Sequence, residues 1–301
     1  MAFLSISFLV LILGGLLSLF MFADSGIPSP KADNVAVIDV SGLITSHESS
    51  DFTAPAQATS SQIIEFIERA EQDPSVAAIM FRIDSGGGTP VATEEIASAI
   101  ERTDKPTLSV IRETGASGAY WIASATDTIF ANRMSIVGSI GVSGSQIGLE
   151  GFMERYNITY RQLVSAEYKD IGSPFREMTE EEKEHIEEQL DEIHKFFADT
   201  VASNRNLSQE EKDEIATGMF WTGSKAKELD LVDQLGGQQE AIAYIEDKLD
   251  VEVGVVEYKK EPSFGDLFFG IFSEASYYLG KGLGSSMLQN EYNKAHEKFF
   301  I

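Results

Sequence analysis

One serine is a candidate nucleophile because small residues flank it on both sides. Ser117 lies in the segment GASGAYW, residues 115–121, at the turn between a predicted strand and a predicted helix. Small neighbours admit a peptide backbone, and the NH of Gly118 after the serine can help to bind an oxyanion. A serine that caps the helix is the structural alternative and, for an isolated serine, the commoner role.

A glycine run in the preceding strand-to-helix loop could supply further NH groups. Gly86, Gly87 and Gly88 lie within DSGGGTP, residues 84–90. Glycines leave backbone NH groups accessible to a substrate, and such groups suit a developing oxyanion. An ordinary tight turn and a phosphate cradle are the alternatives. The phosphate-loop pattern GxxxxGK[ST] is absent, and the acidic surroundings do not favour phosphate.

The base that would activate a serine is not a visible histidine. The chain has no cysteine, which excludes thiol nucleophiles and disulfides. The chain has four histidines: His47, His185, His194 and His296. Their spacing matches no zinc site, so we expect no metal and no cofactor. We expect His185 and His194 to face solvent on an acidic helix. A Ser-His-Asp triad therefore has no placed base, and a lysine is the best remaining candidate.

The charge of the chain limits its partners. Against 23 Lys and Arg residues stand 48 Asp and Glu residues, which gives a net charge of −25. Such a field repels phosphate backbones, so nucleic acid is not an expected partner. We interpret the acidic excess as a solvated surface.

Apolar strands alternate with amphipathic helices through the middle of the chain. Strands are predicted at residues 35–40, 76–83, 107–111, 128–132 and 140–144, and helices at 61–71, 92–102 and from Ser117. This order predicts an α/β fold with a mainly parallel sheet. Capping boxes at Thr179 with Glu182 and at Ser208 with Glu211 predict a long and a shorter helix, and the stretch to Val256 predicts a further helix and strand.

The two ends of the chain have a different character. Residues 3–22 form an uncharged apolar run that is long enough to cross a bilayer. A cleaved signal peptide is the alternative, but no basic region precedes the run. We therefore predict a transmembrane anchor at 1–23, a linker at 24–34, a catalytic domain at 35–258 and an aromatic, glycine-rich tail at 259–301. The tail could contact a membrane surface, the core or another subunit.

The motifs, taken in order, resemble one family. The segments DSGGGTPVATEEI, GASGAYWIASATDTIFAN, GSIGV and YKDIGSPFREMTEEE are similar to the signal peptide peptidase A family of serine peptidases, in its half-length form. The resemblance covers residues 34–256. It implies a ClpP/crotonase-like α/β fold and a membrane protein with a single-pass anchor and its catalytic domain on the extracytoplasmic side of the cell membrane. The charges near the anchor do not themselves encode that orientation.

The resemblance also assigns roles. Ser117 falls on the family nucleophile, Lys169 on its general base and Ser139 on a hydroxyl near that lysine, while Gly87 and Gly88 fall on the oxyanion loop. It implies homo-oligomeric rings whose active sites are completed between protomers. The implied substrates are unfolded or membrane-derived peptides, including cleaved signal peptides.

The sequence departs from the family pattern, and the proposed base has a physical requirement. Gly86 replaces a proline, which predicts a less restrained oxyanion loop, and Ala119, Val137 and Ala166 replace a glycine, a threonine and a glycine. A lysine that acts as a base near neutral pH needs a pKa lowered by about 3 units, or about 4 kcal/mol, through burial. The negative charge of the adjacent Asp170 opposes this lowering of the pKa, so the amine of Lys169 must be buried away from water.

Three alternatives remain open from the sequence. A crotonase-type acyl-CoA enzyme could use the same sheet, although no basic site for coenzyme A is evident. A membrane-tethered assembly protein without activity would leave Ser117 as a helix cap and Lys169 as a surface charge. A related peptidase that cleaves stomatin-like partners is the third.

Overall fold

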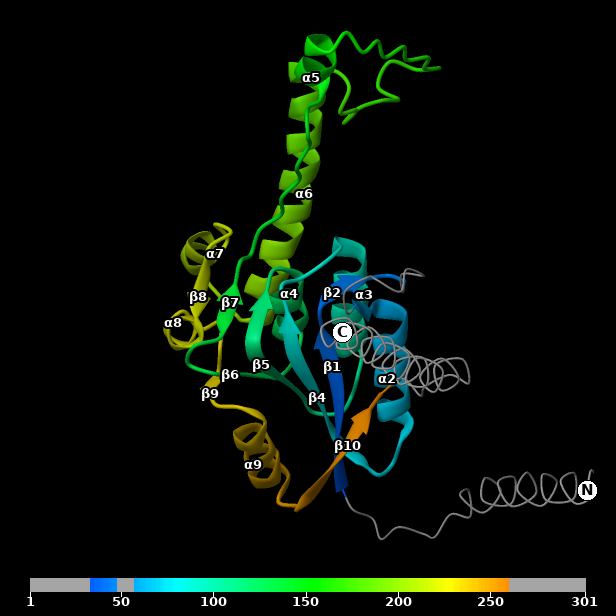
Figure 1. Ribbon diagram of the computed structural model, residues 1–301. Coiled ribbons are helices and arrows are strands. Elements are labelled where there is room, and N and C mark those ends of the chain that lie inside the picture. Colours follow the sequence, from blue (N-terminus) through cyan, green and yellow to red (C-terminus); the bar gives the residue numbers. More distant parts are fainter. Residues whose placement is uncertain (1–32, 48–56, 260–301) are drawn as a thin grey trace, which may run out of the picture. The chain divides into compact units, whose positions relative to one another are not determined.

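The computed structural model describes residues 33–47 and 57–259, and its centre is a mainly parallel β-sheet (Figure 1). The strand order is β10-β1-β4-β5-β6-β9, with β7 beside β5 and β8 beside β7. Every pairing in this sheet is parallel except that of β7 with β8. The predicted α/β fold with a mainly parallel sheet is confirmed. The strands of this sheet are β1 (Asp33–Ser41), β4 (Val76–Ser85), β5 (Thr107–Ala116), β6 (Thr128–Ala131), β7 (Ile136–Gly138), β8 (Phe220–Thr222), β9 (Gln234–Leu235) and β10 (Val253–Tyr258).

Alternating side chains of the strands enter two hydrophobic cores, one on each face of the sheet. In β4, Phe81 and Ile83 join the larger core, whereas Met80 joins the smaller one. Successive side chains of a strand point to opposite faces, so a strand that is apolar at nearly every position must be covered on both. This explains why the strands are continuous apolar runs.

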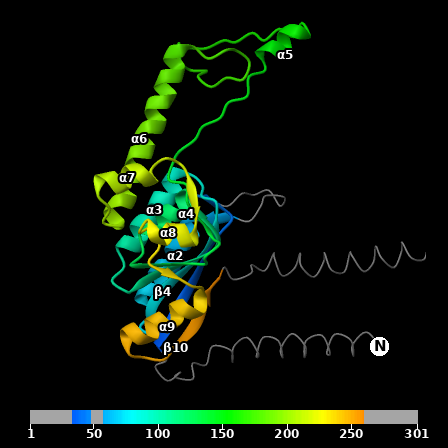
Figure 2. The same cartoon turned by 90° about the vertical axis from the view of Figure 1, so that its left-hand side faces the viewer.

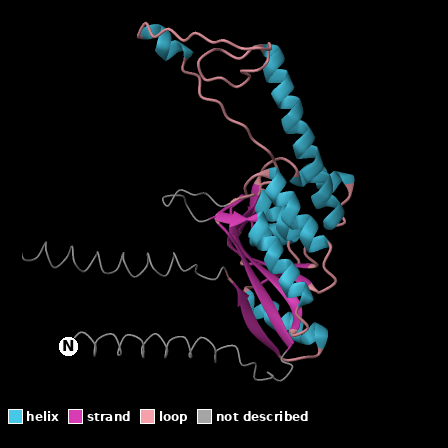
Figure 3. Cartoon of the chain, turned by 90° about the vertical axis from the view of Figure 1, so that its right-hand side faces the viewer, coloured by secondary structure: helices cyan, strands magenta, loops and turns pink. Residues whose placement is uncertain are grey.

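Helices cover both faces (Figures 2 and 3). Buried residues of α2, α3, α4 and α6 belong to the larger core, and those of α9 to the smaller. The helices are α2 (Ser60–Gln72), α3 (Pro90–Glu101), α4 (Gly118–Ser124), α5 (Glu150–Arg155), α6 (Glu180–Asn204), α7 (Gln209–Ile215), α8 (Gly223–Glu228) and α9 (Gln238–Leu249). All these elements lie between Asp33 and Tyr258.

Two expectations for this region were wrong. Residues 140–144 are not a strand: the strand is β7, whose pairing with β5 ends at Gly138, and the next residue, Ser139, has a positive φ of 53°. His194 does not face solvent, because it is half-buried and its Nε2 is buried without a hydrogen-bond partner among the described residues. It lies next to Ile193 and one turn before the buried Phe197, on the side of α6 that packs against the domain.

The long helix α6 begins where predicted. Thr179 and Glu182 form both bonds of the capping box, and Ser208 and Glu211 do the same at α7. Residues 144–178, which we call the arm, precede α6. The arm begins alongside α6, where Gly144 lies near Leu190, and reaches the end of α6 far from the sheet, where α5 lies (Figure 1). The arm exposes many large apolar side chains, among them Ile147, Phe152, Tyr156, Ile158 and Leu163.

No helix in the described residues has the length and apolarity needed to cross a membrane. The anchor predicted at 1–23 lies outside the described residues, and so do almost all of the linker at 24–34 and of the tail at 259–301.

Candidate active site

Ser117 lies at a strained turn between the end of β5 and the start of α4. Its φ of 53° is a conformation that L-residues rarely adopt. Its NH donates a 2.8 Å hydrogen bond to the carbonyl of Gly138, which ties the turn to β7. The side chain is half-buried and makes no capping hydrogen bond to α4. The hydroxyl is therefore not used as a helix cap, and a strand–turn–helix arrangement of this kind suits a nucleophile.

The glycine loop lies directly against this turn. A methyl group added at Gly118 would come within 3.4 Å of the Gly88 nitrogen, and one added at Gly87 within 2.9 Å of the Gly118 nitrogen. Within the described chain the NH of Gly88 has no acceptor, and Gly118 is the first residue of α4, where NH groups have no partner inside the helix. These two NH groups are available to an oxyanion.

Gly87 has a different part in the loop. Its NH donates a 3.0 Å hydrogen bond to Ser85 Oγ, so it is already engaged. Its φ of 106° is open to glycine but strained for other residues. A methyl group there would lie 2.9 Å from Ser117 Cβ. Gly87 thus lets the loop approach the serine.

The glycine loop has no proline, but hydrogen bonds to neighbouring backbone groups restrain it. The strand β2 (Leu43–Thr45), which pairs with β3 (Gln57–Thr59) in a small second sheet, lies beside it. Ile44 donates to the Gly87 carbonyl at 3.1 Å and accepts from the Thr89 NH at 2.9 Å. Ser85 Oγ donates to the Gly42 carbonyl at 2.6 Å. These bonds hold the loop although Gly86 gives it no stiffness of its own.

Ser139 lies one residue beyond the carbonyl that binds the Ser117 NH. Its own NH donates to the Met219 carbonyl at 2.8 Å, and the residue is half-buried. Its hydroxyl has no hydrogen-bond partner among the described residues. The fold therefore brings Ser139 to the edge of the Ser117 turn, whereas the family resemblance had implied a position near Lys169.

A cavity of about 180 Å³ opens beside the serine. Residues that the sequence did not single out form much of its wall: Pro90, Thr93, Trp121, Val142, Ile193 and Phe197. The ring of Trp121 stacks on that of Phe197 with centroids 4.9 Å apart. Trp121 follows Ser117 by one helical turn, and that spacing could have indicated it. Phe197 comes from a distant helix, and nothing local in the sequence places it there.

Lys169 does not line this cavity in the same chain. It is exposed, and its turn is hydrogen-bonded to the first turn of α6, whereas the cavity contacts α6 from Ile193 onward. From Glu182 to Ile193 the helix rises about 16 Å, at 1.5 Å per residue. Ser117, Gly88, Gly118 and Ser139 are thus brought together within one chain, and Lys169 is not.

Comparison with known proteins adds the family. Residues 99–252, about half of the chain, match the family described as Peptidase family S49. A Methanocaldococcus jannaschii protein that is provisionally named a protease is 36% identical over 224 residues, which cover 73% of this chain and 71% of that protein. A chloroplastic serine protease of Arabidopsis thaliana is 28% identical over 249 residues, which cover 80% of this chain and 37% of that protein.

A solved structure of a membrane-bound stomatin-specific protease mutant, in complex with a substrate peptide, aligns with a TM-score of 0.49 at 17% identity, covering 81% of this chain and 99% of that one. The match over residues 99–252 includes the Ser117 turn, β7 and the arm. The chain belongs to peptidase family S49, a family of serine proteases.

Proposed function

We propose that this protein is a membrane-anchored endopeptidase that works with a Ser117–Lys169 dyad. The observation that carries the proposal is the Ser117 turn: a half-buried hydroxyl at positive φ, not used as a cap, beside a cavity and the available NH groups of Gly88 and Gly118. Strand-to-helix turns of this kind present nucleophiles to a bound carbonyl.

The reaction follows from these groups. Ser117 Oγ attacks the peptide carbonyl carbon while its proton passes to the neutral amine of Lys169. The carbonyl oxygen becomes an oxyanion that accepts hydrogen bonds from the NH groups of Gly88 and Gly118. The C–N bond then breaks, and the leaving amine takes the proton from Lys169. Water, deprotonated by the same amine, attacks the acyl-enzyme and releases the second product and the Ser117 hydroxyl.

The proposed dyad takes its lysine from a second copy of the chain. Within one chain Lys169 is exposed and remote from the cavity. A lysine that serves as a base has to lose its proton, and burial favours the neutral amine. Contact with a neighbouring protomer would bury Lys169 and deliver it to Ser117, and the apolar side chains of the arm support such a contact. We propose a ring assembled in this way.

The substrates proposed are unfolded or membrane-derived peptides, including cleaved signal peptides. The cavity wall of Trp121, Val142, Ile193 and Phe197 fits an apolar side chain next to the scissile bond. A membrane anchor at residues 3–22 would hold the domain, on the extracytoplasmic side, near peptides that are released from the bilayer.

The decisive experiment combines two inactive variants on a fluorogenic peptide with small apolar residues. Ser117→Ala and Lys169→Ala should each lower turnover by about a thousandfold. The matched controls Ser203→Ala and Lys227→Ala change exposed residues outside the site and should keep wild-type turnover. Near wild-type turnover of either site variant would refute the dyad.

Mixing then tests the shared site. When the two inactive variants are unfolded and reassembled together in equal amounts, about one quarter of the sites join an intact serine to an intact lysine of a neighbour. We expect turnover to return to that level. If the mixture stays as inactive as its components, the lysine does not come from a neighbouring copy.

A further inference from the structure

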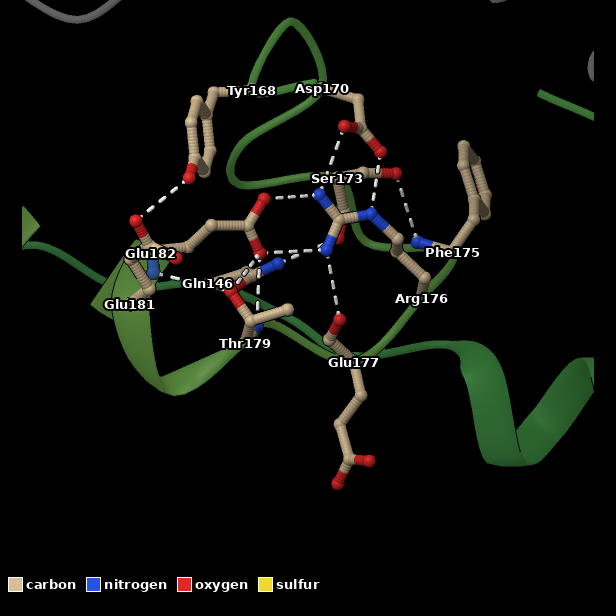
Figure 4. Close-up of polar contacts among 10 residues, drawn as sticks. All are labelled: Gln146, Tyr168, Asp170, Ser173, Phe175, Arg176, Glu177, Thr179, Glu181 and Glu182. Carbon is tan, nitrogen blue, oxygen red and sulfur yellow. Dashed lines mark hydrogen bonds and ion pairs between the residues drawn. The ribbon is translucent and has the colours of Figure 1, made fainter. Parts of the chain in front are cut away.

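The turn that carries Lys169 is tied to α6 on both sides of the lysine (Figure 4). Before it, Tyr168 donates its hydroxyl to Glu181 Oε1 at 2.8 Å. After it, Asp170 accepts two hydrogen bonds from Arg176, 2.6 Å from Nε and 2.9 Å from Nη2. The lysine itself has no ion pair with any described residue. Its neighbours are held and its amine is left free.

Arg176 joins this turn to the start of α6. Besides Asp170, its guanidinium donates to Glu182 Oε2 at 2.8 Å, to Glu182 Oε1 and to the Glu177 carbonyl at 3.0 Å. Glu182 is 3% exposed and also accepts from the Thr179 NH at 2.9 Å in the capping box. A planar guanidinium can hold two carboxylates in fixed directions, which a lysine cannot. We call Arg176, Asp170, Glu182 and Thr179 the arginine cluster.

Within the arginine cluster, the carboxylate of Asp170 is paired with Arg176. Hydrogen bonding from Arg176 lowers the pKa of Asp170 to about 2 and that of Glu182 to about 2, so both are ionised at neutral pH. Arg176 is the cation that both of them contact within the described chain. Without Arg176, Asp170 would be a carboxylate without its cationic partner, one residue from Lys169. An ion pair between Asp170 and Lys169 would favour the charged amine, which cannot act as a base.

We propose that Arg176 is a positioning residue for Lys169: it fixes the turn that presents the lysine and occupies the Asp170 carboxylate, leaving the amine free to enter the Ser117 site of a second copy. This inference rests on the proposed function. The other titratable side chains around the turn are Glu167 on the turn itself and, before or on α6, Glu177, Glu181, Glu182, Glu184, His185 and Glu188. All but His185 are acidic, so loss of Arg176 leaves the lysine mainly among carboxylates.

The test measures kcat, KM and the acid limb of the pH profile for variants of the full chain. Arg176→Gln should lower kcat by about a hundredfold with KM within about twofold, because the lysine is misplaced while the cavity is intact. Its acid limb should move to higher pH by about one unit, because an unpaired Asp170 raises the pKa of the lysine. Arg176→Lys keeps a charge without the fork and should fall between wild type and Arg176→Gln.

A second substitution separates charge from tethering. In the double variant Arg176→Gln with Asp170→Asn, the acid limb should return to within about 0.3 units of wild type, because the unpaired carboxylate is gone. The value of kcat should remain low, because the turn is still untethered. A double variant whose limb stays with that of Arg176→Gln would overturn the charge argument.

The matched control is Lys195→Gln, which breaks an exposed ion pair with Asp199 on the same helix. It should leave kcat and the pH profile unchanged. Thermal unfolding and light scattering establish that each variant is folded and assembled. If an Arg176 variant does not fold or assemble, the Asp170→Asn single variant, which keeps the contact of Arg176 with Glu182, is tested in its place. In that variant kcat should fall without an upward shift of the limb. Wild-type kcat in every cluster variant, with Lys169→Ala inactive, would overturn the inference alone; an active Lys169→Ala would overturn the proposed function.

Discussion

At the scale of single residues, the Ser117 turn depends on close backbone contact. A side chain at Gly88 would overlap the Ile44 carbonyl at 1.9 Å, and one at Gly118 would lie 2.4 Å from Thr93 Oγ1. The first obstacle is backbone that is fixed by hydrogen bonds, whereas the second is one side chain. A second substitution that shortens Thr93 can therefore relieve the overlap at Gly118, whereas no side-chain substitution can relieve the overlap at Gly88.

We predict that Gly118→Ala lowers turnover by about a hundredfold, because the added methyl pushes on Thr93 and shifts the oxyanion NH. Thr93→Ala in the same chain removes both atoms of Thr93 nearest to the added methyl and should recover most of that loss. Gly88→Ala is the matched comparison and should not be recovered by Thr93→Ala. Peptidase assays of the four variants check this, and equal recovery at both glycines would contradict it.

The sequence was informative about these residues in unequal degree. Small residues around Ser117 and the glycine run predicted the turn and the loop because both are local patterns. The sequence did not predict that the NH of Gly87 is bonded and that of Gly88 is free within the described chain. This difference depends on Ser85 Oγ, which accepts from the Gly87 NH, and on β2, which lies beside the loop. Thr93 was missed because a threonine inside a helix carries no local signal of contact with another helix.

At the scale of elements, α4 and α6 are joined by the aromatic stack behind the cavity. Trp121 is 4% exposed and Phe197 is 2% exposed, whereas Phe196, which also contacts Trp121, is 56% exposed. Burial rather than contact with tryptophan should decide the energetic effect. The pair Phe196 and Phe197 therefore offers a comparison within one helical turn.

We predict that Phe197→Ala lowers the free energy of unfolding by about 3–5 kcal/mol, through lost burial and a new cavity. Phe196→Ala should cost less than about 1 kcal/mol, since its ring is mostly in water already. Phe197→Ala should also improve turnover of peptides with larger apolar side chains relative to small ones, because it widens the cavity wall. Urea unfolding and a substrate series give both readings. Similar losses for the two phenylalanines would contradict the assignment of α6 to the core.

The attachment of the arm to α6 should depend on pH. Asp170 and Glu182 have a pKa lowered to about 2 by the hydrogen bonds of Arg176, from ordinary values of 3.8 and 4.5. Groups with a depressed pKa stabilise the folded state above their ordinary pKa, and that contribution is lost as pH falls toward 2. Limited pepsin digestion should therefore cut within residues 144–178 faster at pH 2 than at pH 4. Glu182→Gln, digested in parallel, should already be cut quickly at pH 4; equal rates for it and wild type would contradict the tether.

Elements were easier to predict than their contacts. Each long strand is a nearly continuous apolar run, and both capping boxes are local, so β1, β4, β5, α6 and α7 followed from the sequence. The strand expected at residues 140–144 failed because pairing with β5 is decided by register, Ala116 opposite Gly138, and not by β-propensity. The position of Lys169 along α6, far from the serine, is a tertiary property that no local pattern encodes.

At the scale of the whole molecule, the proposed ring would have to form against a large charge. Copies with a net charge of −25 repel one another, and this repulsion weakens as salt is added. The attraction must then come from apolar contact, and the described chain offers it on the arm. Leu163 is 98% exposed there, so it contributes nothing to the folding of a single copy.

We predict that Leu163→Asp prevents assembly without unfolding the domain, because it removes an apolar contact between copies and adds a negative charge to an interface of acidic proteins. Turnover should fall with assembly, since an isolated chain keeps Lys169 away from Ser117. Thr159→Asp is the matched control: it adds the same charge to an exposed position of the arm but removes no large apolar side chain, so its effect should be smaller and should be relieved by salt. Light scattering and peptidase assays at two salt concentrations distinguish the variants. An active Leu163→Asp monomer would mean that the serine obtains its base within one chain.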